Sequence, residues 1–363
     1  MTQRVLHIVG RMDRAGAETM VMNLYREIDR TKFQFDFVYF TAAVCDYDAE
    51  IEALGGRIHR IRQRNPISRF FALRRLLRNG SWSIVHAHTL FSSGLHLAAA
   101  RLAGIPHRVA HSHSTQDANS TSRAGRLYQR LMRLLLVWAP TAYVACGAAA
   151  AAYLFPGRRD VVVITNAIDI DRFANASGSH IRAQLGVLGE CLLILQVGRY
   201  MPVKNHAFSA QIALALREAG VDFRMLFVGT GPEQAAIEAL VNANGLQDQV
   251  LLLGLREDIP ELMAAADVML MPSLHEGFPV VLVESQAAGL PAVISSVISS
   301  EVDLGLRLVE SVGLEEPLGQ WADRIRRVAS MIVPEASIRR TTIAKRGFSP
   351  ASGVRLLEAV YGA

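Results

Sequence analysis

Short apolar runs alternate along the chain with longer stretches in which apolar residues recur at helical spacing. Uninterrupted short runs are typical of buried parallel strands, whereas apolar positions three and four residues apart indicate amphipathic helices. In the first half, strands are predicted at 5–9, 35–40, 84–86, 108–110, 142–145 and 161–164. Helices are predicted at 19–28, 51–54 and 94–102. Because strands and helices alternate, we expect a doubly wound parallel sheet.

The alternation restarts after 166–180, a segment of mostly small and polar residues. Further strands are predicted at 192–197, 224–228, 250–253, 268–271 and 292–295. The helices predicted among and after them include 207–219, 233–243 and an amphipathic C-terminal helix at 350–361. The pattern therefore predicts an α/β protein of two Rossmann-like domains, 1–170 and 171–349.

Composition agrees with two globular domains. The chain has 363 residues, of which 51% are hydrophobic and 20% charged. No apolar run approaches the roughly 18 residues that a membrane span requires, and the apolar stretch at the N-terminus is too short for a signal peptide. Three scattered cysteines, Cys45, Cys146 and Cys191, favour neither a disulfide framework nor a zinc site. We expect a protein of the reducing cytoplasm.

The net charge of +5 conceals an uneven distribution. Residues 1–180 carry 23 Lys and Arg against 13 Asp and Glu, whereas 181–363 carry 15 against 20. Between Glu52 and Asp117 lie ten arginines and no acidic residue, and 69–78 has the pattern of a basic amphipathic helix. Such a surface can meet an anionic membrane or a phosphorylated acceptor, or can be simply solvated. Nucleic acid is not expected, because no nucleic-acid-binding module accompanies the arginines.

Candidate chemistry follows the predicted strands. Gly16 comes after the first strand of the first half, and the stretch GRYMPVKN, with Arg199 and Lys204, follows the first strand of the second half. The turn 272–279 contains Glu276 and leads into a helix that carries Glu284. Ligands of open α/β sheets bind at the carboxyl ends of the strands, and arginine and lysine there suit a diphosphate.

Several other classes of site are disfavoured. The chain contains neither GxGxxG nor GK[ST], which argues against a dinucleotide-dependent oxidoreductase and a P-loop ATPase. His86 and His88 form an H-x-H pair at a strand end, but two histidines alone make a poor metal site. We expect no metal at this position.

Four stretches resemble glycosyltransferase family 4, a retaining family with the GT-B fold. They are AGAE at 15–18, GRYMPVKN at 198–205, GTGP at 229–232, and SLHEGFPVVLVESQAAGLP at 273–291. The last contains the E-x7-E element of the family as Glu276 and Glu284. The resemblance covers nearly the whole chain, and its detail is most similar to bacterial enzymes that build exopolysaccharide and capsule. It implies two domains facing a central cleft, with the C-terminal segment 350–363 returning to the first domain.

The resemblance also implies roles for individual residues. Arg199 and Lys204 would neutralise the donor diphosphate, and Glu284 would bind the ribose. Glu276, with the backbone amides of Gly277 and Phe278, would hold the transferred sugar and phosphate. Gly16 would approach the diphosphate from the other domain.

A histidine of the first domain would contact the sugar. We assign this role to His113, with His111 as the alternative. Since the two are separated by one residue, we expect only one of them to line the cleft.

The function expected is retaining transfer of a hexose from a nucleoside-diphosphate sugar, without a metal or other cofactor. The acceptor would be a hydroxyl of a saccharide, in particular a lipid-linked one, and the enzyme would sit on the inner face of the plasma membrane. Two alternatives stay open: a hydrolysing UDP-sugar epimerase of the same architecture, and a non-catalytic saccharide-binding scaffold.

Overall fold

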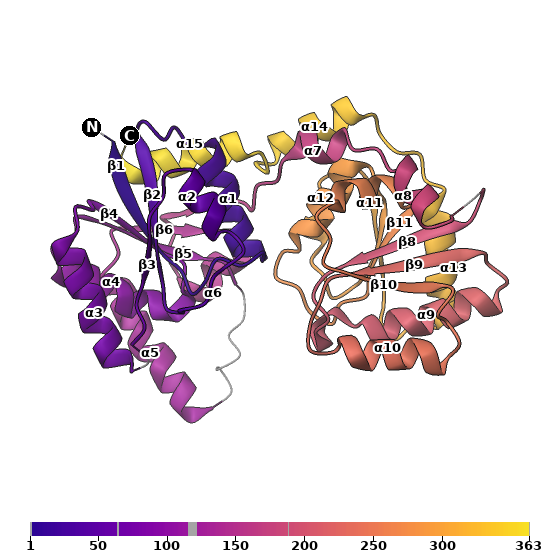
Figure 1. Cartoon of the computed structure of the whole chain (residues 1–363), viewed down its shortest axis with the longest axis horizontal. Coiled ribbons are helices and arrows are strands. Elements are labelled where there is room, and N and C mark those ends of the chain that lie inside the picture. The colour runs from indigo at the N-terminus through magenta and orange to yellow at the C-terminus, as the bar shows by residue number, and fades with distance from the viewer. Residues whose placement is uncertain (1, 64, 115–121, 188, 363) are drawn as a thin grey trace. The chain divides into compact units, whose positions relative to one another are not determined.

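A computed structural model describes residues 2–63, 65–114, 122–187 and 189–362. The chain divides into two compact units. The first consists of Met1–Ile168 and Gly347–Ala363, and the second of Asp169–Arg346. Each unit is built around one parallel sheet with helices on both faces (Figure 1).

The first unit contains a seven-stranded sheet with the order β3-β2-β1-β4-β5-β6-β7. Its strands are β1 (Gln3–Ile8), β2 (Phe33–Tyr39), β3 (Ile58–Arg60), β4 (Ile84–Ala87), β5 (His107–Ser112), β6 (Ala142–Ala145) and β7 (Val161–Val163). All neighbouring strands are parallel. The order reverses between β1 and β4, and such a switch point is where doubly wound sheets bind ligands.

Helices cover both faces of this sheet. Residues of α1 (Gly16–Glu27) and α15 (Pro350–Tyr361) share one apolar core with the strands, and α3 (Pro66–Asn79), α4 (Ser93–Leu102) and α5 (Arg123–Trp138) contribute to the core on the other face. The shorter helices are α2 (Asp48–Ala53) and α6 (Ala148–Leu154). The C-terminal helix α15 buries Val354, Leu357 and Tyr361 in the first unit, which confirms that the chain returns there.

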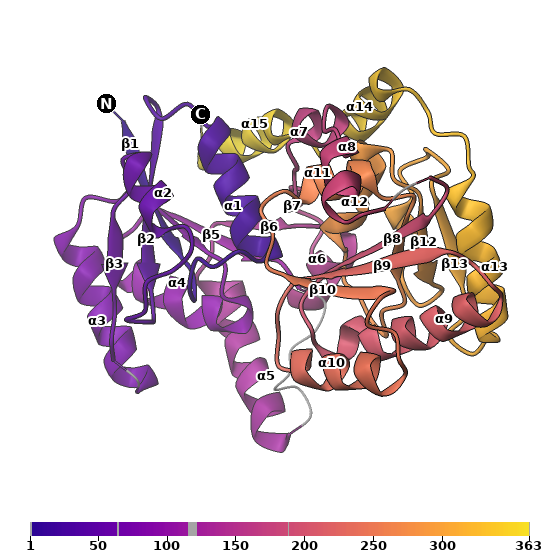
Figure 2. The ribbon, with the colours of Figure 1, turned by 45° about the vertical axis from the view of Figure 1, so that its right-hand side comes forward.

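The second unit contains a six-stranded parallel sheet with the order β10-β9-β8-β11-β12-β13. Its strands are β8 (Leu192–Val197), β9 (Phe223–Val228), β10 (Val250–Gly254), β11 (Val268–Met271), β12 (Ala292–Ser295) and β13 (Val309–Val312). Here the order reverses between β8 and β11. One face packs on α9 (His206–Glu218), α10 (Gln234–Ala243) and α13 (Leu318–Ala329) (Figure 2). The remaining helices are α7 (Ile170–Ala174), α8 (Ser179–Gln184), α11 (Ile259–Ala265), α12 (Val280–Ala288) and α14 (Ala336–Lys345).

The predicted α/β class and parallel sheets are confirmed. The pattern missed two short edge strands, β3 and β13, because an edge strand of three or four residues leaves little apolar signal. It also missed the long helix α5, whose apolar residues occupy two faces. One face buries Met132 and Leu136, whereas Leu127, Leu131 and Leu134 remain exposed on the other.

Candidate functional site

Three loops of the second unit lie together because β9, β8 and β11 are neighbours in the sheet. These loops are 198–205, 229–232 and 272–279. Two of them touch backbone to backbone. The amide of Gly198 donates to Val228 O at 2.9 Å, and that of Tyr200 donates to Thr230 O at 3.0 Å.

Glycine is required where these two loops meet. Gly229 has φ +140°, and a Cβ there would lie 2.1 Å from the carbonyl oxygen of Gly198. A Cβ on Gly231 would lie 2.4 Å from the carbonyl oxygen of Tyr200. Any side chain at either position would push the loops apart. The GTGP stretch is therefore a support for the loop that carries Arg199 and Lys204.

An ion pair joins the loops after β8 and β11. Lys204 Nζ donates to Glu276 Oε1 at 2.7 Å, and Ser273 Oγ donates to the same oxygen at 2.7 Å. The amide of Leu274 donates to Val203 O at 2.8 Å, and Asn205 Nδ2 donates to Pro272 O at 3.0 Å. Because these bonds fix both backbones, the cation and the carboxylate stay at the switch point of the second sheet.

The side chains of two further predicted residues lack a direct partner within the described part of this unit. The guanidinium of Arg199 makes no hydrogen bond or ion pair among the described residues, and this side chain is exposed. The side-chain carboxylate of Glu284, in the second turn of α12, accepts no hydrogen bond from the described residues. Burial raises the pKa of Glu284 to about 7, although the positive charge of Arg172 opposes the rise. A ligand that donates hydroxyl hydrogen bonds to such a carboxyl group would stabilise its charged form.

Gly277 and Phe278 lie at the end of the same turn, directly before α12. Gly277 is exposed, Phe278 is partly buried, and the N-cap of α12, Pro279, makes no side-chain capping bond. The first amides of α12 are thus left without a side-chain cap at their N-terminal end. This is the arrangement that favours an anion or a sugar hydroxyl oxygen.

In the first unit, Gly16 is the first residue of helix α1. The sequence had predicted a loop at this position. Its N-cap, Ala15, makes no side-chain capping bond, and a Cβ on Gly16 would meet nothing within 4 Å. Beside this helix end is a hollow of about 20 Å³, the size of one water molecule. Its lining residues are Val9, Gly10, Ala17, Glu18, Val21 and His88.

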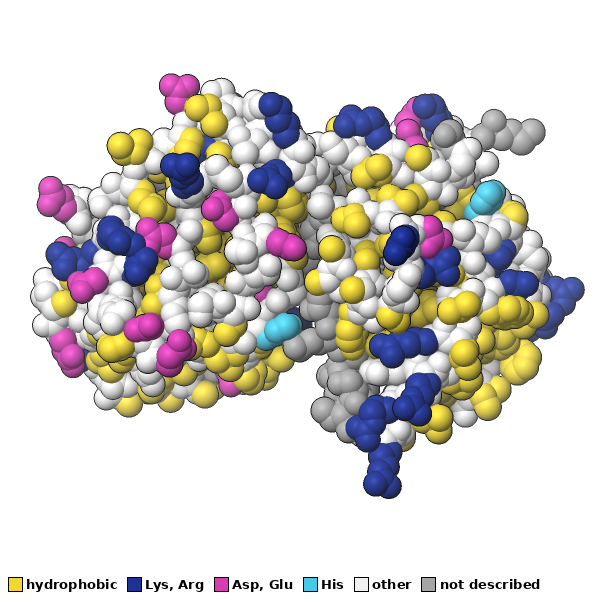
Figure 3. Space-filling model, turned by 180° about the vertical axis from the view of Figure 1, so that it is seen from behind, with side chains coloured by type: hydrophobic (Ala, Val, Ile, Leu, Met, Phe, Trp, Pro, Cys, Tyr) yellow, Lys and Arg dark blue, Asp and Glu magenta, His cyan; other side chains and the backbone are white. Residues whose placement is uncertain are grey.

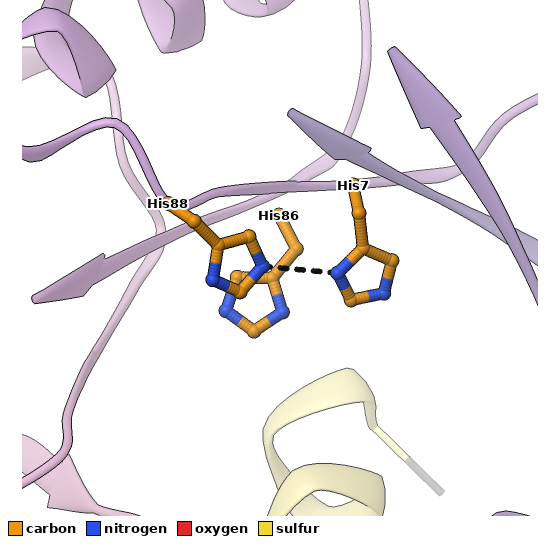
Figure 4. A group of neighbouring side chains, drawn as sticks. All are labelled: His7, His86 and His88. Atoms are coloured by element: carbon orange, nitrogen blue, oxygen red, sulfur yellow. Dashed lines mark hydrogen bonds between the residues drawn. The ribbon is translucent and has the colours of Figure 1, made fainter. Parts of the chain in front are cut away.

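Five histidines gather at the switch point of the first sheet, on β1, β4 and β5 or directly after them. They are His7, His86, His88, His111 and His113. Figure 4 shows three of them, with the bond of 2.9 Å between His7 Nδ1 and His88 Nε2. Burial lowers the pKa of every one, to about 4 for His113 and to well below the ordinary value for the others. The whole cluster is therefore uncharged at neutral pH.

The reason for expecting only one of His111 and His113 at the ligand is wrong, although the expectation itself stays a prediction, since His111 is fully buried and His113 only partly. Side chains two residues apart on a strand share a face, and these two rings stack with centroids 3.9 Å apart. The sequence analysis also missed His7. His7 lies in the middle of its predicted strand, 5–9, whereas the other four histidines lie at the carboxyl ends of theirs or within three residues after them.

Among the described residues, two groups have the composition for a metal site: His7, His86 and His88, and His88, His111 and His113. Both ring nitrogens of His86 and of His88 are already engaged by neighbouring side chains. A metal would have to displace at least one of these bonds. Catalysis without a metal stays a prediction.

Comparison with known proteins identifies the family. Residues 14–172 match the model described as "Glycosyltransferase Family 4", and 192–329 match "Glycosyl transferases group 1". The putative glycosyltransferase EpsF of Bacillus subtilis (strain 168) is 42% identical over 99% of this chain and 96% of its own length. This chain is a family 4 glycosyltransferase.

Other similar proteins are more distant. A capsular polysaccharide biosynthesis glycosyltransferase, CapH of Staphylococcus aureus, is 23% identical over 90% of this chain and 91% of its own. An Escherichia coli galactosyltransferase that acts on GlcNAc-diphosphoundecaprenol is 28% identical over 62% of this chain and 61% of its own. The crystal structure of Anabaena HepE in complex with UDP-glucose has a TM-score of 0.80, with 20% identity, 99% of this chain and all of that chain covered. The expected GT-B fold of this glycosyltransferase is thereby confirmed.

Proposed function

We propose that this family 4 glycosyltransferase transfers a hexose, with retention, from a nucleoside-diphosphate sugar to a hydroxyl of a lipid-linked saccharide in polysaccharide biosynthesis. The observation that carries the proposal is the pair of Lys204 and Glu276 beside the unpartnered Arg199. At this switch point, the two cations can bind a diphosphate and the carboxylate can accept hydrogen bonds from sugar hydroxyls.

The donor roles follow from charge. Arg199 has no partner to lose and can bind the diphosphate as a planar fork, while Lys204 adds a point charge. These charges stabilise the diphosphate as it leaves, because they lie beside it when negative charge develops. Lys204 must loosen its bond to Glu276 when it turns to the phosphate. This frees Glu276 to accept from a sugar hydroxyl beside the amides of Gly277 and Phe278.

The remaining site residues recognise other parts of the donor. Glu284 accepts hydrogen bonds from the ribose hydroxyls, and Gly16 offers the uncapped end of α1 to the diphosphate. His113 contacts the transferred sugar. Retention without a protein nucleophile is explained by same-face attack, in which the leaving phosphate accepts the proton of the acceptor hydroxyl. No metal or other cofactor takes part in this scheme.

The acceptor assignment is supported by relatives. The Escherichia coli relative acts on a sugar attached to diphosphoundecaprenol, and CapH takes its name from capsular polysaccharide biosynthesis. An acceptor with a lipid tail brings its enzyme to a membrane surface. No helix in the described part of the chain is long and apolar enough to span a membrane.

A surface of the first unit suits an anionic membrane, and we call it the α3–α5 surface. It comprises the arginines of α3 and the exposed apolar stripe of α5. Arg74, Arg75 and Arg78 line a hollow of about 400 Å³ together with Phe71 and Asn79. The exposed stripe consists of Leu127, Leu131, Leu134, Val137 and Trp138. Figure 3 shows basic and apolar side chains gathered over α5.

The physical reason for this docking is the combination of charge and apolar surface. A monomeric protein rarely leaves a helix face of leucines in water. Arginines beside such a face attract anionic headgroups, while the leucines enter the interface between headgroups and acyl chains. We therefore place the enzyme peripherally on the cytoplasmic face of the plasma membrane.

The decisive experiment is thermal stabilisation by a panel of UDP-, GDP- and ADP-sugars, followed by transfer assays with the sugar nucleotide that stabilises. A ligand that binds only the folded state raises its apparent stability. A transferase releases nucleoside diphosphate faster when a lipid-linked saccharide is added. An epimerase converts UDP-sugar without any acceptor, and a binding scaffold releases no nucleotide, so either result would exclude the proposal.

A further inference from the structure

Three of the clustered histidines form one hydrogen-bonded row. His7 Nδ1 lies 2.9 Å from His88 Nε2, and His88 Nδ1 lies 2.8 Å from His113 Nε2. A second row runs beside it, from the hydroxyl of Tyr361 to His86 Nδ1 at 2.8 Å and from His86 Nε2 to His111 Nδ1 at 3.1 Å. The rings of the two rows stack, with centroids 4.3 Å apart for His86 and His88.

The rows are a regular consequence of the sheet. His7 is the register partner of His86, but it bonds to His88, two residues further along β4. His86 is the register partner of Val109, but it bonds to His111, two residues further along β5. Each of these hydrogen bonds therefore joins a histidine to the residue two positions beyond its register partner on the neighbouring strand. Side chains two apart share a face, so the H-x-H pattern on two strands builds both rows at once.

A row of neutral rings has a direction. Each uncharged imidazole carries one N–H and one lone pair. If His7 donates to His88, then His88 must donate to His113, and the proton of His113 is on Nδ1. If the direction is reversed, His113 carries its proton on Nε2 and His7 keeps an N–H on its own Nε2. The protonation of His7 thus dictates that of His113, two bonds away.

Burial at the two ends selects the direction. His7 Nε2 and His113 Nδ1 are both shielded from solvent and have no hydrogen-bond partner among the described residues. His7 is 1% exposed and lies against the ring of Phe35, whereas His113 is only partly buried. An orphaned buried N–H is a rarer defect than an unused lone pair. The lone pair therefore belongs at His7, which is enclosed as a whole, and the N–H at His113, which is the one of the two end residues that retains partial exposure.

We propose that His7 and His88 are positioning residues that hold His113 with its proton on Nδ1, so that His113 presents an N–H to an oxygen of the transferred sugar. This inference rests on the proposed function, which places His113 at the sugar. An N–H donor recognises the lone pairs of a hydroxyl or ring oxygen. The second row, capped by Tyr361 of the C-terminal helix, packs against the first and keeps water from breaking it.

The same geometry disfavours a metal ion at this cluster. A ligand histidine must direct a lone pair at the metal, and His88 uses one nitrogen as donor and the other as acceptor within its row. Metal binding is nevertheless an outcome that the test below can reveal.

The test is a two-bond ¹H–¹⁵N correlation spectrum of histidine-labelled full-length protein at pH 7, without substrate. This spectrum distinguishes Nδ1–H, Nε2–H and doubly protonated rings, and His113→Asn assigns the signal of His113. We expect Nδ1–H for His7, His88 and His113. Addition of UDP-glucose, which is bound in one HepE complex, should shift the Nδ1–H signal of His113.

Two substitutions of His7 separate its hydrogen bond from its volume. His7→Leu removes the donor, so His113 should populate both tautomers, and the turnover rate should fall about tenfold with little change in KM for the sugar nucleotide. His7→Asn places an amide N–H near the position of Nδ1 and should retain both the tautomer and most of the rate. His59→Gln, which alters a half-buried histidine outside the rows, is the control and should change neither.

An Nε2–H signal for His113 in the native protein would overturn the proposal. So would His7→Leu with an unchanged tautomer and rate, or a transition metal bound at one equivalent whose removal by chelator changes the ring signals. If His7→Leu fails to fold, the native spectrum and His7→Asn still decide. If no sugar is transferred but the tautomers are as expected, the proposed function fails while the tautomer assignment stands.

Discussion

Lys204 and Glu276 are 72 residues apart in the chain, and their side chains form an ion pair of 2.7 Å. Their side chains are 22% and 11% exposed, so the pair is shielded from most solvent. It lies where the strand order of the second sheet reverses, between β8 and β11. An ion pair at this point can be opened by a ligand that supplies both a phosphate and a hydroxyl.

Replacing Lys204 with alanine should therefore remove donor use without unfolding the protein. Glu276 keeps its bond from Ser273, so the turn should persist. We expect transfer to fall about 100-fold or more, because a fixed charge at the leaving diphosphate is lost. Thermal stabilisation by the sugar nucleotide should disappear as well. Lys345→Ala, which removes an exposed lysine of the same unit, is the control; equal activity of the two variants would reject the role of Lys204.

The pKa of Glu284 predicts a pH dependence of stability. The folded-state pKa is about 7, above the ordinary value of 4.5, so the folded protein binds the proton more tightly than the unfolded chain. Burial of Glu284 therefore does not lower the free energy of unfolding below pH 4.5, where the group is protonated in both states. The free energy of unfolding falls as the pH rises from about 5 to 8. The loss should be about 2 kcal/mol, because the side chain is not fully buried.

Denaturant unfolding at pH 5 and pH 8 measures this effect. Glu284→Gln cannot ionise, so the variant should lose less stability than the native protein over that interval. A sugar nucleotide should abolish the difference in the native protein, because ribose hydroxyls would stabilise the carboxylate. Identical pH profiles for both proteins would show that Glu284 does not carry a raised pKa.

The meeting of the loops after β8 and β9 predicts a large effect of one methyl group. Gly229→Ala would place a Cβ 2.1 Å from the carbonyl oxygen of Gly198, at a φ of +140°. We expect a destabilisation of about 3 kcal/mol and a displaced Arg199 loop. Gly319→Ala, in helix α13 with nothing within 4 Å of the added Cβ, should be neutral or stabilise by up to about 1 kcal/mol. Calorimetry of the two variants makes the comparison.

Membrane docking can be tested on the two parts of the α3–α5 surface. Leu127→Ser, Leu131→Ser and Leu134→Ser together should weaken co-sedimentation with phosphatidylglycerol vesicles about 100-fold, because buried apolar area is lost. Replacing Arg74, Arg75 and Arg78 with alanine should weaken it by a similar factor, since each contributes about 1 kcal/mol. Only the arginine variant should lose its sensitivity to salt.

The matched control is Ile332→Ser, a residue of the second unit that is 96% exposed. It should leave vesicle binding unchanged. Neutral phosphatidylcholine vesicles should bind the native protein weakly. Undiminished binding of both the leucine and the arginine variants would mean that this surface meets solvent rather than lipid.

Much of the site could be predicted because the residues that carry it are local. Glu276 and Glu284 are eight positions apart on one turn and helix, and Arg199 and Lys204 belong to a single loop after β8. Because these residues are close together in the sequence, their spacing can be read without knowledge of the fold. Gly16 was predicted to lie in a loop before a helix that begins at residue 19, but α1 begins at Gly16 itself.

The histidine rows could not be predicted in the same way. His7, His88 and His113 come from three segments, and their bonds depend on the register of β1, β4 and β5. A single-residue shift of one strand would turn its side chains to the other face. The exposed stripe of α5 was likewise hidden, because its pattern does not reveal which of its two apolar faces the core takes.

Local sequence pattern specifies the alternation of strands and helices, the two Rossmann-like halves and the loops that carry Arg199, Lys204 and Glu276. These are set by local periodicity and by glycine, proline and charge at short spacing. Three features emerge only when the chain is folded: the pairing of Lys204 with Glu276, the burial that raises the pKa of Glu284, and the meeting of five histidines in two rows. Burial and long-range pairing depend on strand order and register, which no local pattern contains.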